Sequence, residues 1–571
     1  MFRLAFIIGV CQAVLGSYTL GPELLTNPNF DSDFSGSGWY CNNCNLERST
    51  DAVSGTHSAN VTNRAANWAG IAQSVNVKQN TAYYFESSMK LLNDESNMWA
   101  STEVMLHVTH TNGTQIHRIM GRNPHFRSAQ GWMKLGGDAM VSDMPVQEAR
   151  IYVQVAYGAI NYLLDNTTMR EIVLNENWVE EANTRIEQIR KRDVNMRVQV
   201  NNVLIEPTDI VVEVRQTTHQ FGFGSSVYAD RISGSTTTDQ RYQDFFYQNF
   251  NWGTIENALK WRQMEWNYGE INYARPENAI NAMLAQNVSL RGHCVYWGVE
   301  QFTPNWIRNM TGEEVRAEVT RRANGVVDRF RGRLHHWDVN NENLHGKFFE
   351  EKTGNADIMA DMFREVRDLD PACKLFINDY LVVNEGWLTT ALANQARELQ
   401  AAGFEVYIGA QGHFGLRDGR FDPAWVQRRL DSLAAPGVPL WITELDCEDP
   451  DFNVRADKYE AALRAFFSHP SVEGIIIWGF WDGAHFRPGS SLVDGEDFTI
   501  NAAGLRWQQL IQQEWRTQQD YQLYLYDETI NFRGFHGDYD VIVLDNGVEI
   551  QRQSFTLNKD SGTLSVNVNI E

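Results

Sequence analysis

Hydrophobic and polar residues alternate in short runs from Leu24 to about Val173, and Gly, Asn and Ser separate the runs. Alternation of period two at this spacing predicts an antiparallel β-sandwich. Over residues 177–193 the apolar spacing becomes helical and charged residues accumulate, which predicts a domain boundary. The clearest predicted strands are 69–77, 81–92, 101–110 and 149–157.

From Phe221 onward, short apolar runs alternate with amphipathic stretches of helical period, such as 312–330 and 355–369. One run recurs roughly every 36 residues, which predicts a (β/α)8 TIM barrel. An open doubly wound sheet would need a Gly-rich phosphate turn after its first strand, and "FGFGSS" at 221–226 is not such a turn. The predicted barrel strands are 221–226, 250–257, 289–297, 334–342, 374–380, 406–413, 438–446 and 472–480.

The last fifty or so residues alternate again around an Asp-Asn-Gly turn at 545–547, after a predicted helix at 506–519. They predict a small β-strand extension packed on the barrel. The chain is therefore divided into a signal peptide (1–16), a β-sandwich (17–175), a linker that flanks the barrel (176–220), the barrel (221–518) and a C-terminal extension (519–571).

The first 16 residues have the pattern of a secretory signal peptide. Arg3 precedes the apolar run Leu4–Leu15, and small residues predict cleavage near Gly16–Ser17. This run is too short to span a bilayer, and no later stretch approaches the roughly 20 apolar residues required. We expect a secreted, extracellular protein without a membrane partner. Candidate N-glycosylation sites are Asn60, Asn112, Asn166, Asn287 and Asn309.

Charge and cysteine content narrow the possible partners. The chain has 49 basic and 72 acidic residues, a net charge of −23, so we predict no nucleic-acid partner. We also expect a monomer. Without Cys11 of the signal peptide five cysteines remain, so at least one is unpaired within the chain. No second Cys or His pair joins Cys41 and Cys44 to complete a zinc site, and we interpret them as a local disulfide or as two small buried side chains.

Polar and aromatic side chains stand at the ends of the predicted barrel strands, where the active site of a TIM barrel lies. A single carboxylate there is usually a solvated loop residue, but several strand ends carry compatible chemistry. Amides, acids and flat rings suit a neutral polyhydroxylated ring. No phosphate loop and no HExxH or HxH spacing is present, so we predict neither cofactor nor metal. The set is Glu256, Asn257, Lys260, His293, Trp297, Asn341, Glu342, Asn378, Asp379, Tyr380, Gln411, His413, Glu444, Asp446 and Trp478.

Two glutamates in this set are the minimum apparatus for glycoside hydrolysis. Glu342 and Glu444 end strands three βα units apart, so they face each other across the barrel mouth. One must be protonated and the other ionised, which requires surroundings that separate their pKa values. We interpret Glu342 as the acid/base and Glu444 as the nucleophile, supported by a contact between His413 and Asp446.

Five ordered motifs carry a family resemblance: "TIENALKW", "RGHCVYW", "WDVNNE", "QGH" and "WITELD". In order and spacing they resemble glycoside hydrolase family 10, the β-1,4-xylanases, and the likeness covers roughly residues 181–518. The stretch from "RKRDV" to "FGFGSS" and the later "FRGFHGDY" resemble the plant and invertebrate branch of that family. The resemblance implies a TIM barrel that cleaves xylan with retention of configuration.

The resemblance also implies individual roles. Glu342 matches the acid/base, Asn341 the partner of the sugar 2-hydroxyl, and Glu444 the nucleophile that His413 and Asp446 support. The implied contacts of subsites −2 and −1 are Glu256, Asn257 and Lys260, and subsite −1 is lined by His293, Trp297, Gln411 and Trp478; we predict further substrate contacts from Tyr380 and Phe486.

Two positions depart from the family pattern. Many members have His where this chain has Gly298, and a second Trp where it has Phe486. Both positions lie at the sugar-binding wall, so the choice between xylose and glucose chains stays open. The alternatives to a xylanase are a β-1,4-glucanase or dual-activity enzyme, a non-catalytic polysaccharide-binding protein, and a transglycosylase that passes the retained sugar to another sugar.

The N-terminal sandwich resembles carbohydrate-binding modules of the family 4, 9 and 22 type. The likeness rests on "NPNFDSD" near its start and "YLLDNTTMREI" at its end. Such a module implies tethering to a polysaccharide partner, which raises the local substrate concentration. Trp68 and Trp39 are candidate aromatic platforms, with core packing as the alternative for each.

Overall fold

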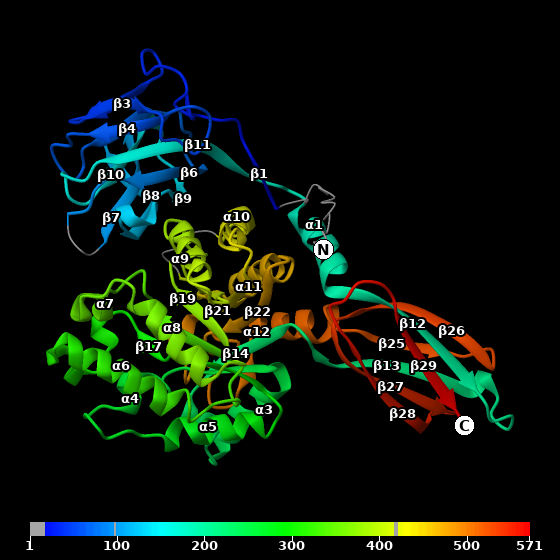
Figure 1. Ribbon diagram of the computed structural model, residues 1–571. Coiled ribbons are helices and arrows are strands. Elements are labelled where there is room, and N and C mark those ends of the chain that lie inside the picture. The colour runs from blue at the N-terminus through cyan, green and yellow to red at the C-terminus, as the bar shows by residue number, and fades with distance from the viewer. Residues whose placement is uncertain (1–16, 96–98, 416–420) are drawn as a thin grey trace, which may run out of the picture.

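The computed structural model describes residues 17–95, 99–415 and 421–571. It contains an N-terminal sandwich, a central barrel and a C-terminal sandwich, and the two sandwiches lie on different sides of the barrel (Figure 1). The predicted signal peptide, residues 1–16, lies outside the described residues. Within them, no helix is both long enough and apolar enough to cross a bilayer.

The N-terminal sandwich is antiparallel, as its alternating sequence predicts, and all four clearest predicted strands form. Its core lies between two sheets and includes Phe85, Leu106 and Ile151. One sheet runs β3 (Asn45–Ser49), β4 (Ser58–Thr62), β11 (Tyr162–Leu174), β6 (Ala82–Leu91), β9 (Met133–Met140), with β1 (Tyr18–Leu20) beside β11. The other runs β2 (Trp39–Asn42), β5 (Gly70–Ser74), β10 (Val146–Val155), β7 (Ala100–His110), β8 (Gln115–Phe126).

All eight predicted barrel strands form one closed parallel sheet. The third predicted strand is split in two, and both pieces pair with the fourth, which closes the barrel. In sheet order the strands are β16 (Ser289–Gly292), β15 (Trp252–Ile255), β14 (Gly222–Val227), β22 (Val472–Ile477), β21 (Leu440–Cys447), β20 (Tyr407–Phe414), β19 (Lys374–Asp379), β18 (His336–Asn341) and β17 (Tyr296–Trp297).

Helices surround these strands, and two of them begin with capping boxes. Thr236 with Asp239 starts α3, and Thr311 with Glu314 starts α6, so their first free backbone N–H groups are satisfied locally. The barrel helices are α2 (Ala229–Ile232), α3 (Thr237–Asn249), α4 (Trp261–Met264), α5 (Ala274–Leu284), α6 (Gly312–Val326), α7 (Phe348–Thr353), α8 (Ile358–Leu369), α9 (Thr389–Ala401), α10 (Pro423–Ala434), α11 (Phe452–Phe467) and α12 (Ala502–Gln508). A short ribbon of β23 (Val493–Asp494) and β24 (Thr499–Ile500) precedes α12.

The segment expected to be a linker, 176–220, instead supplies two of the seven strands of the C-terminal sandwich. After α1 (Trp178–Arg190), it forms β12 (Lys191–Val200) and β13 (Ile210–His219). Their alternate apolar residues pack with those of the last strands into a separate core, so the C-terminal part is larger than a small extension. The two sheets run β26 (Asp527–Phe535), β12, β29 (Leu564–Ile570) and β25 (Gln518–Gln522), β13, β27 (Gly537–Asp545), β28 (Val548–Leu557).

The predicted Asp-Asn-Gly turn joins β27 to β28. Asn546 and Gly547 both have positive φ, 48° and 80°, as the central residues of a type I′ hairpin turn require. Cys41 and Cys44 form the local disulfide, one of the two expected arrangements. The remaining described cysteines, Cys294, Cys373 and Cys447, are free and buried, so the barrel holds no disulfide among its described residues.

Candidate active site

The predicted site residues converge at the carboxyl ends of the barrel strands. Glu342 directly follows β18 and is only 9% exposed. The indole Nε1 of Trp297 donates to its Oε2 at 2.8 Å, and the amide of Gln411 to its Oε1 at 3.3 Å. Its backbone has φ +56°, a conformation that costs a non-glycine residue energy and that is found at functional sites.

The surroundings of Glu342 favour its protonated form. Burial raises the pKa of Glu342 to about 7, and the negative charges of Asp379 and Glu444 act in the same direction. The hydrogen bonds from Trp297 and Gln411 oppose this shift only in part. A carboxyl group with such a pKa can donate a proton near neutral pH.

Glu444, in β21, is equally buried but is surrounded by donors and cations. The Asn378 amide donates to its Oε1 at 3.0 Å, and Nε2 of His413 lies 3.3 Å from its Oε2. Burial alone would raise the pKa of Glu444, but the His413 hydrogen bond and the charges of His293, His413 and Lys260 lower it below its ordinary value. The surroundings therefore shift the pKa values of the two glutamates in opposite directions.

His413 is held by Asp446. Its Nδ1 lies 2.6 Å from Oδ2 of Asp446, and this carboxylate, which is fully buried, raises the pKa of His413 although burial would lower it. The predicted His413–Asp446 contact is present and places a positive imidazole against Glu444. On its other side Asp446 faces Arg487, whose guanidinium lies 3.5 Å away.

Asn378 connects Asn341 with Glu444. Its Nδ2 donates to Oδ1 of Asn341 at 2.9 Å and to Glu444, while Thr443 donates its hydroxyl to Oδ1 of Asn378 at 2.5 Å. The orientation of the Asn341 amide is thus set, and its buried Nδ2 has no protein partner. A buried donor without a partner is uncommon, and a ligand hydroxyl would satisfy it.

A polar row follows β15. Nδ2 of Asn257 donates to Oε1 of Glu256 at 3.0 Å, and the Lys260 ammonium donates to Oδ1 of Asn257 at 3.1 Å. That ammonium lies 4.7 Å from the ring centre of Trp297 and 6.0 Å from that of Trp478. Oε2 of Glu256 is buried without a partner. Hydrogen-bonding groups beside aromatic faces are the surface that a sugar ring needs.

Sequence reasoning missed Asp338, which fixes the predicted residue His293. Oδ2 of Asp338 lies 2.9 Å from Nδ1 of His293, and Oδ1 accepts from Arg291 at 2.5 Å. All three side chains are buried. The sequence could have indicated this role, because Asp338 is a charged residue within the apolar run of β18 and a buried carboxylate needs a partner.

His345 and Trp387 were also missed. The imidazole of His345 stacks on the predicted residue Tyr380, with ring centres 3.6 Å apart, and its Nδ1 lies 2.7 Å from Asp379. The Trp387 ring lies 6.4 Å from His345. Both residues sit on loops, where no strand pattern marks them.

The two departures from the family pattern have distinct surroundings. A Cβ on Gly298 would lie 3.2 Å from the Gly346 carbonyl and 3.3 Å from Asn343, so the following loop occupies the space of a larger side chain. Phe486 is 59% exposed, and its ring centre lies 6.0 Å from that of His413. Phe486 is therefore near the nucleophile's partner and open to solvent.

The two candidate platforms of the N-terminal sandwich differ. Trp68 is 50% exposed and lines a hollow of about 190 Å³ with Tyr40 and Tyr152. Trp39 is 6% exposed, donates its indole N–H to the Thr26 carbonyl at 2.8 Å and packs on Phe30. The prediction of Trp39 as an exposed platform is wrong, because its ring belongs to the core.

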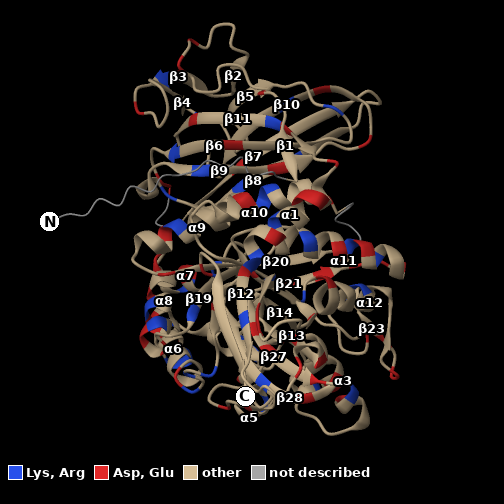
Figure 2. Cartoon of the chain, turned by 90° about the vertical axis from the view of Figure 1, so that its right-hand side faces the viewer, with Lys and Arg blue, Asp and Glu red and all other residues tan. Residues whose placement is uncertain are grey.

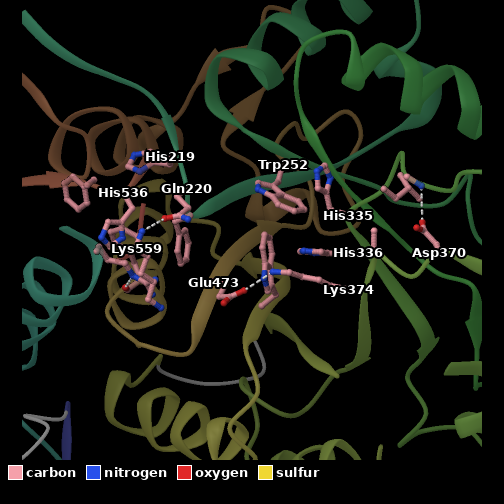
Figure 3. A pocket seen from close by; sticks show the side chains of 18 residues that line it. His219, Gln220, Trp252, His335, His336, Asp370, Lys374, Glu473, His536 and Lys559 are labelled. Atoms are coloured by element: carbon pink, nitrogen blue, oxygen red, sulfur yellow. Dashed lines mark hydrogen bonds and ion pairs between the residues drawn. The ribbon is translucent and has the colours of Figure 1, made fainter. Parts of the chain in front are cut away.

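Another cavity, of about 440 Å³, lies at the opposite end of the barrel (Figure 3). Trp252, His336 and Lys374 begin barrel strands there, while His219 and His536 come from the C-terminal sandwich. The cavity lies at the interface between the barrel and the C-terminal sandwich, on the face of a TIM barrel that contributes to stability rather than to catalysis. Across the described ranges, no three His, Cys, Asp or Glu side chains are grouped to hold a metal ion.

Comparison with known proteins gives the family. The family model "Glycosyl hydrolase family 10" matches residues 214–503, about half of the chain, and the model "Carbohydrate binding domain" matches residues 22–158. The chain therefore belongs to glycosyl hydrolase family 10 and carries a carbohydrate-binding domain. The family resemblance of the five motifs is confirmed.

Three proteins that are similar to this chain are the following. Endo-1,4-beta-xylanase 3 of Arabidopsis thaliana is 30% identical over 528 residues, which are 89% of this chain and 66% of the relative. Anti-sigma-I factor RsgI6 of Acetivibrio thermocellus is 36% identical over 401 residues, 69% of this chain and 50% of the relative. The chain thus spans between half and two thirds of these relatives. The structure of xylanase 10B from Thermotoga petrophila in complex with xylobiose has 22% identity and a TM-score of 0.47, covering 52% of this chain and 95% of that one.

Proposed function

We propose that the chain is a secreted, monomeric, retaining endo-β-1,4-xylanase whose N-terminal module binds the same polysaccharide. The observation that carries the proposal is one polar strand-end site whose surroundings raise the pKa of Glu342 and lower that of Glu444. An acid and a nucleophile are what double displacement at a glycosidic bond requires. The similarity to plant xylanases supports xylan as the substrate.

In the proposed mechanism, Glu444 attacks the anomeric carbon while Glu342 gives its proton to the leaving glycosidic oxygen. The C–O bond breaks and a glycosyl ester of Glu444 remains. Glu342, now ionised, takes a proton from water, whose oxygen attacks the same carbon and releases Glu444. Asn341 donates its free N–H to the sugar 2-hydroxyl, and His413 keeps Glu444 ionised.

A second candidate is a β-1,4-glucanase or dual-activity enzyme. It is favoured by the solvent-exposed Phe486, which stands at the predicted sugar wall where many family members have the larger Trp. Gly298 adds no space there, because the loop after β18 fills the volume that a larger side chain would take. A wall that excludes the glucose hydroxymethyl group selects xylan, and a wider one admits cellulose. Transglycosylation uses the same glycosyl ester, with a sugar in place of water.

The testing experiment measures initial rates of reducing-end release from soluble β-1,4-xylan and from amorphous cellulose. Glu444→Ala serves as the blank, because it should lose nearly all turnover while the module still binds polymer. Faster release from xylan supports the proposal, and equal or faster release from cellulose supports the glucanase. No release from either polymer would support the alternative of a non-catalytic polysaccharide-binding protein.

The retaining mechanism also makes a geometric prediction. The carboxyl groups of Glu342 and Glu444 should be about 5–5.5 Å apart, because the nucleophile must reach the anomeric carbon directly. A crystal structure with a bound xylo-oligosaccharide would measure this separation. About 8 Å would leave room for a water molecule and would contradict retention.

Secretion is supported by features outside the site. Asn112, Asn166, Asn287 and Asn309 are exposed, and the Cys41–Cys44 disulfide suits an oxidising compartment. We expect the secreted protein to begin near Ser17 and to lose mass on treatment with an N-glycosidase. N-terminal sequencing and mass spectrometry would test both, and a retained Met1 would contradict cleavage.

A further inference from the structure

The loop between β19 and α9, residues 380–388, has one edge in the candidate active site. Tyr380 begins it and stacks on His345, and Nδ2 of Asn384 donates to the His413 carbonyl at 2.9 Å. In the barrel, β19 and β15 lie on opposite sides of β18. The 380–388 loop therefore borders Glu342 on the side that is turned away from Glu256 and Lys260. The acid must stand beside the leaving oxygen, which places the loop on the leaving-group side.

The other edge of the loop is bound to the N-terminal module through Arg429 of α10. Its Nε and one terminal nitrogen donate to both carboxylate oxygens of Asp138 in β9, at 2.9 and 2.5 Å. The other terminal nitrogen donates to the carbonyls of Val383 and Asn384, at 3.1 and 2.7 Å. The Asp138 and Arg429 side chains are 5% and 6% exposed. A buried bidentate pair of this kind has one well-defined geometry.

Backbone contacts bring the module still closer to the loop. A Cβ on Gly386 would lie only 2.0 Å from Oδ2 of Asp138, so only glycine permits this approach. The backbone N–H of Arg122, in β8, donates to the Trp387 carbonyl at 2.7 Å, and its guanidinium lies 5.6 Å from the Trp387 ring centre. Figure 2 shows β8 and β9 directly above α9. The module is docked onto the barrel rather than suspended on a flexible tether.

We propose that the N-terminal module is a positioning element of the active site, with Asp138 and Arg122 holding the 380–388 loop and so the leaving-group side of the cleft. The proposal rests on the proposed xylanase function. Tyr380 and Trp387 lie on this loop, with ring centres 3.6 and 6.4 Å from that of His345, whose backbone N–H donates to the Glu342 carbonyl at 3.0 Å. The module therefore sets affinity for the sugars beyond the scissile bond, in addition to any sugar it binds itself.

The test compares two substrates in the full-length Asp138→Asn variant. Soluble xylan needs the leaving-group side, whereas an aryl β-xylobioside has an activated leaving group and depends mainly on the other side. We expect kcat/KM for xylan to fall at least about tenfold, mainly through KM, with less than a twofold change for the aryl substrate. The matched control is Asp357→Asn, which removes the exposed Arg127–Asp357 ion pair of the same interface, and it should change neither.

A second variant and a second readout remain informative if Asp138→Asn folds poorly. Arg122→Gln removes the guanidinium from the Trp387 ring while keeping the backbone hydrogen bond, and it should shift xylan KM in the same direction by a smaller factor. Amide hydrogen exchange of residues 380–388 should accelerate at least about tenfold in Asp138→Asn and not in Asp357→Asn.

Unchanged exchange of the loop in both Asp138→Asn and Arg122→Gln, or an equal loss on both substrates, would overturn the proposal. Failure of the proposed function has a different signature. The wild-type protein would then cleave neither xylan nor the aryl xylobioside, while loop exchange would still report whether the module holds the loop.

Discussion

At the scale of single residues, the two glutamates differ through their partners. Glu342 is buried near Asp379 and Glu444, and its own hydrogen bonds come from the neutral groups of Trp297 and Gln411. Glu444 is buried against His413, which Asp446 holds in its charged form. The same burial therefore yields an acid in one place and an ion in the other.

This difference predicts a bell-shaped pH profile of kcat/KM on xylan. Activity should fall as pH rises through about 7, because Glu342 loses the proton that it must donate. Activity should also fall when the pH is lowered far enough to protonate the nucleophile Glu444. This acidic limb should lie below the ordinary pKa of a glutamate, because the pKa of Glu444 is lowered. Steady-state rates from pH 3 to 9 would measure both limbs. An alkaline limb that persists unchanged in Glu342→Gln would contradict its assignment to Glu342.

The raised pKa of Glu342 also affects stability. The folded state holds the proton of Glu342 more tightly than the unfolded state does. The stability that this proton gives the fold is therefore fully present below about pH 4.5 and is lost as pH rises through 7. Glu342→Gln, which stays neutral, should gain up to about 3 kcal/mol over wild type at pH 8 and nothing at pH 4. Melting temperatures at both pH values would show this. The exposed control Glu176→Gln should show no such pH-dependent gain.

At the scale of elements, the barrel strands and their polar ends were predictable because both depend on local patterns. β12 and β13 were missed although Val194, Met196, Val198 and Val200 alternate cleanly, since charged residues at the start of β12 continue the helical pattern of α1. The Asp138–Arg429 pair joins residues nearly 300 positions apart. No local pattern announces such a contact, because only the docked domains bring the two groups together.

The buried cluster of β16 and β18 gives an element-scale prediction. Asp338→Asn should cost about 3–5 kcal/mol of stability, because Arg291 would remain buried without its counter-ion. Asp497→Asn breaks the exposed pair with Arg241 and should cost less than about 1 kcal/mol. Denaturant unfolding of the two variants would measure the difference. Equal small losses would show that Arg291 finds another partner.

At the scale of the whole molecule, the C-terminal sandwich is one body beside the barrel but is built from two separate stretches of sequence, β12 and β13 before the barrel and β25 to β29 after it (Figure 1). Truncation after Thr517 removes β25 to β29 and leaves the apolar faces of β12 and β13 without partners. We expect insoluble protein from this truncation, measured as the soluble fraction after expression.

Point variants in β29 provide the matched control for that truncation. Val568→Asp places a charge in the sandwich core and should reduce solubility in the same way, whereas Asn567→Asp, on the exposed side of the strand, should not. Soluble, active protein from both the truncation and Val568→Asp would show that the sandwich is dispensable.

The divided sandwich also sets an order of events during synthesis. β12 and β13 leave the ribosome before the barrel, and their partner strands follow only after roughly 300 further residues. At 5–20 residues per second, the early strands wait on the order of 15–60 s for completion. The N-terminal module needs no such wait, because all its strands precede α1. While the barrel folds, the nascent chain thus carries β12 and β13 with unpaired strand edges. These edges are where a chaperone would be needed.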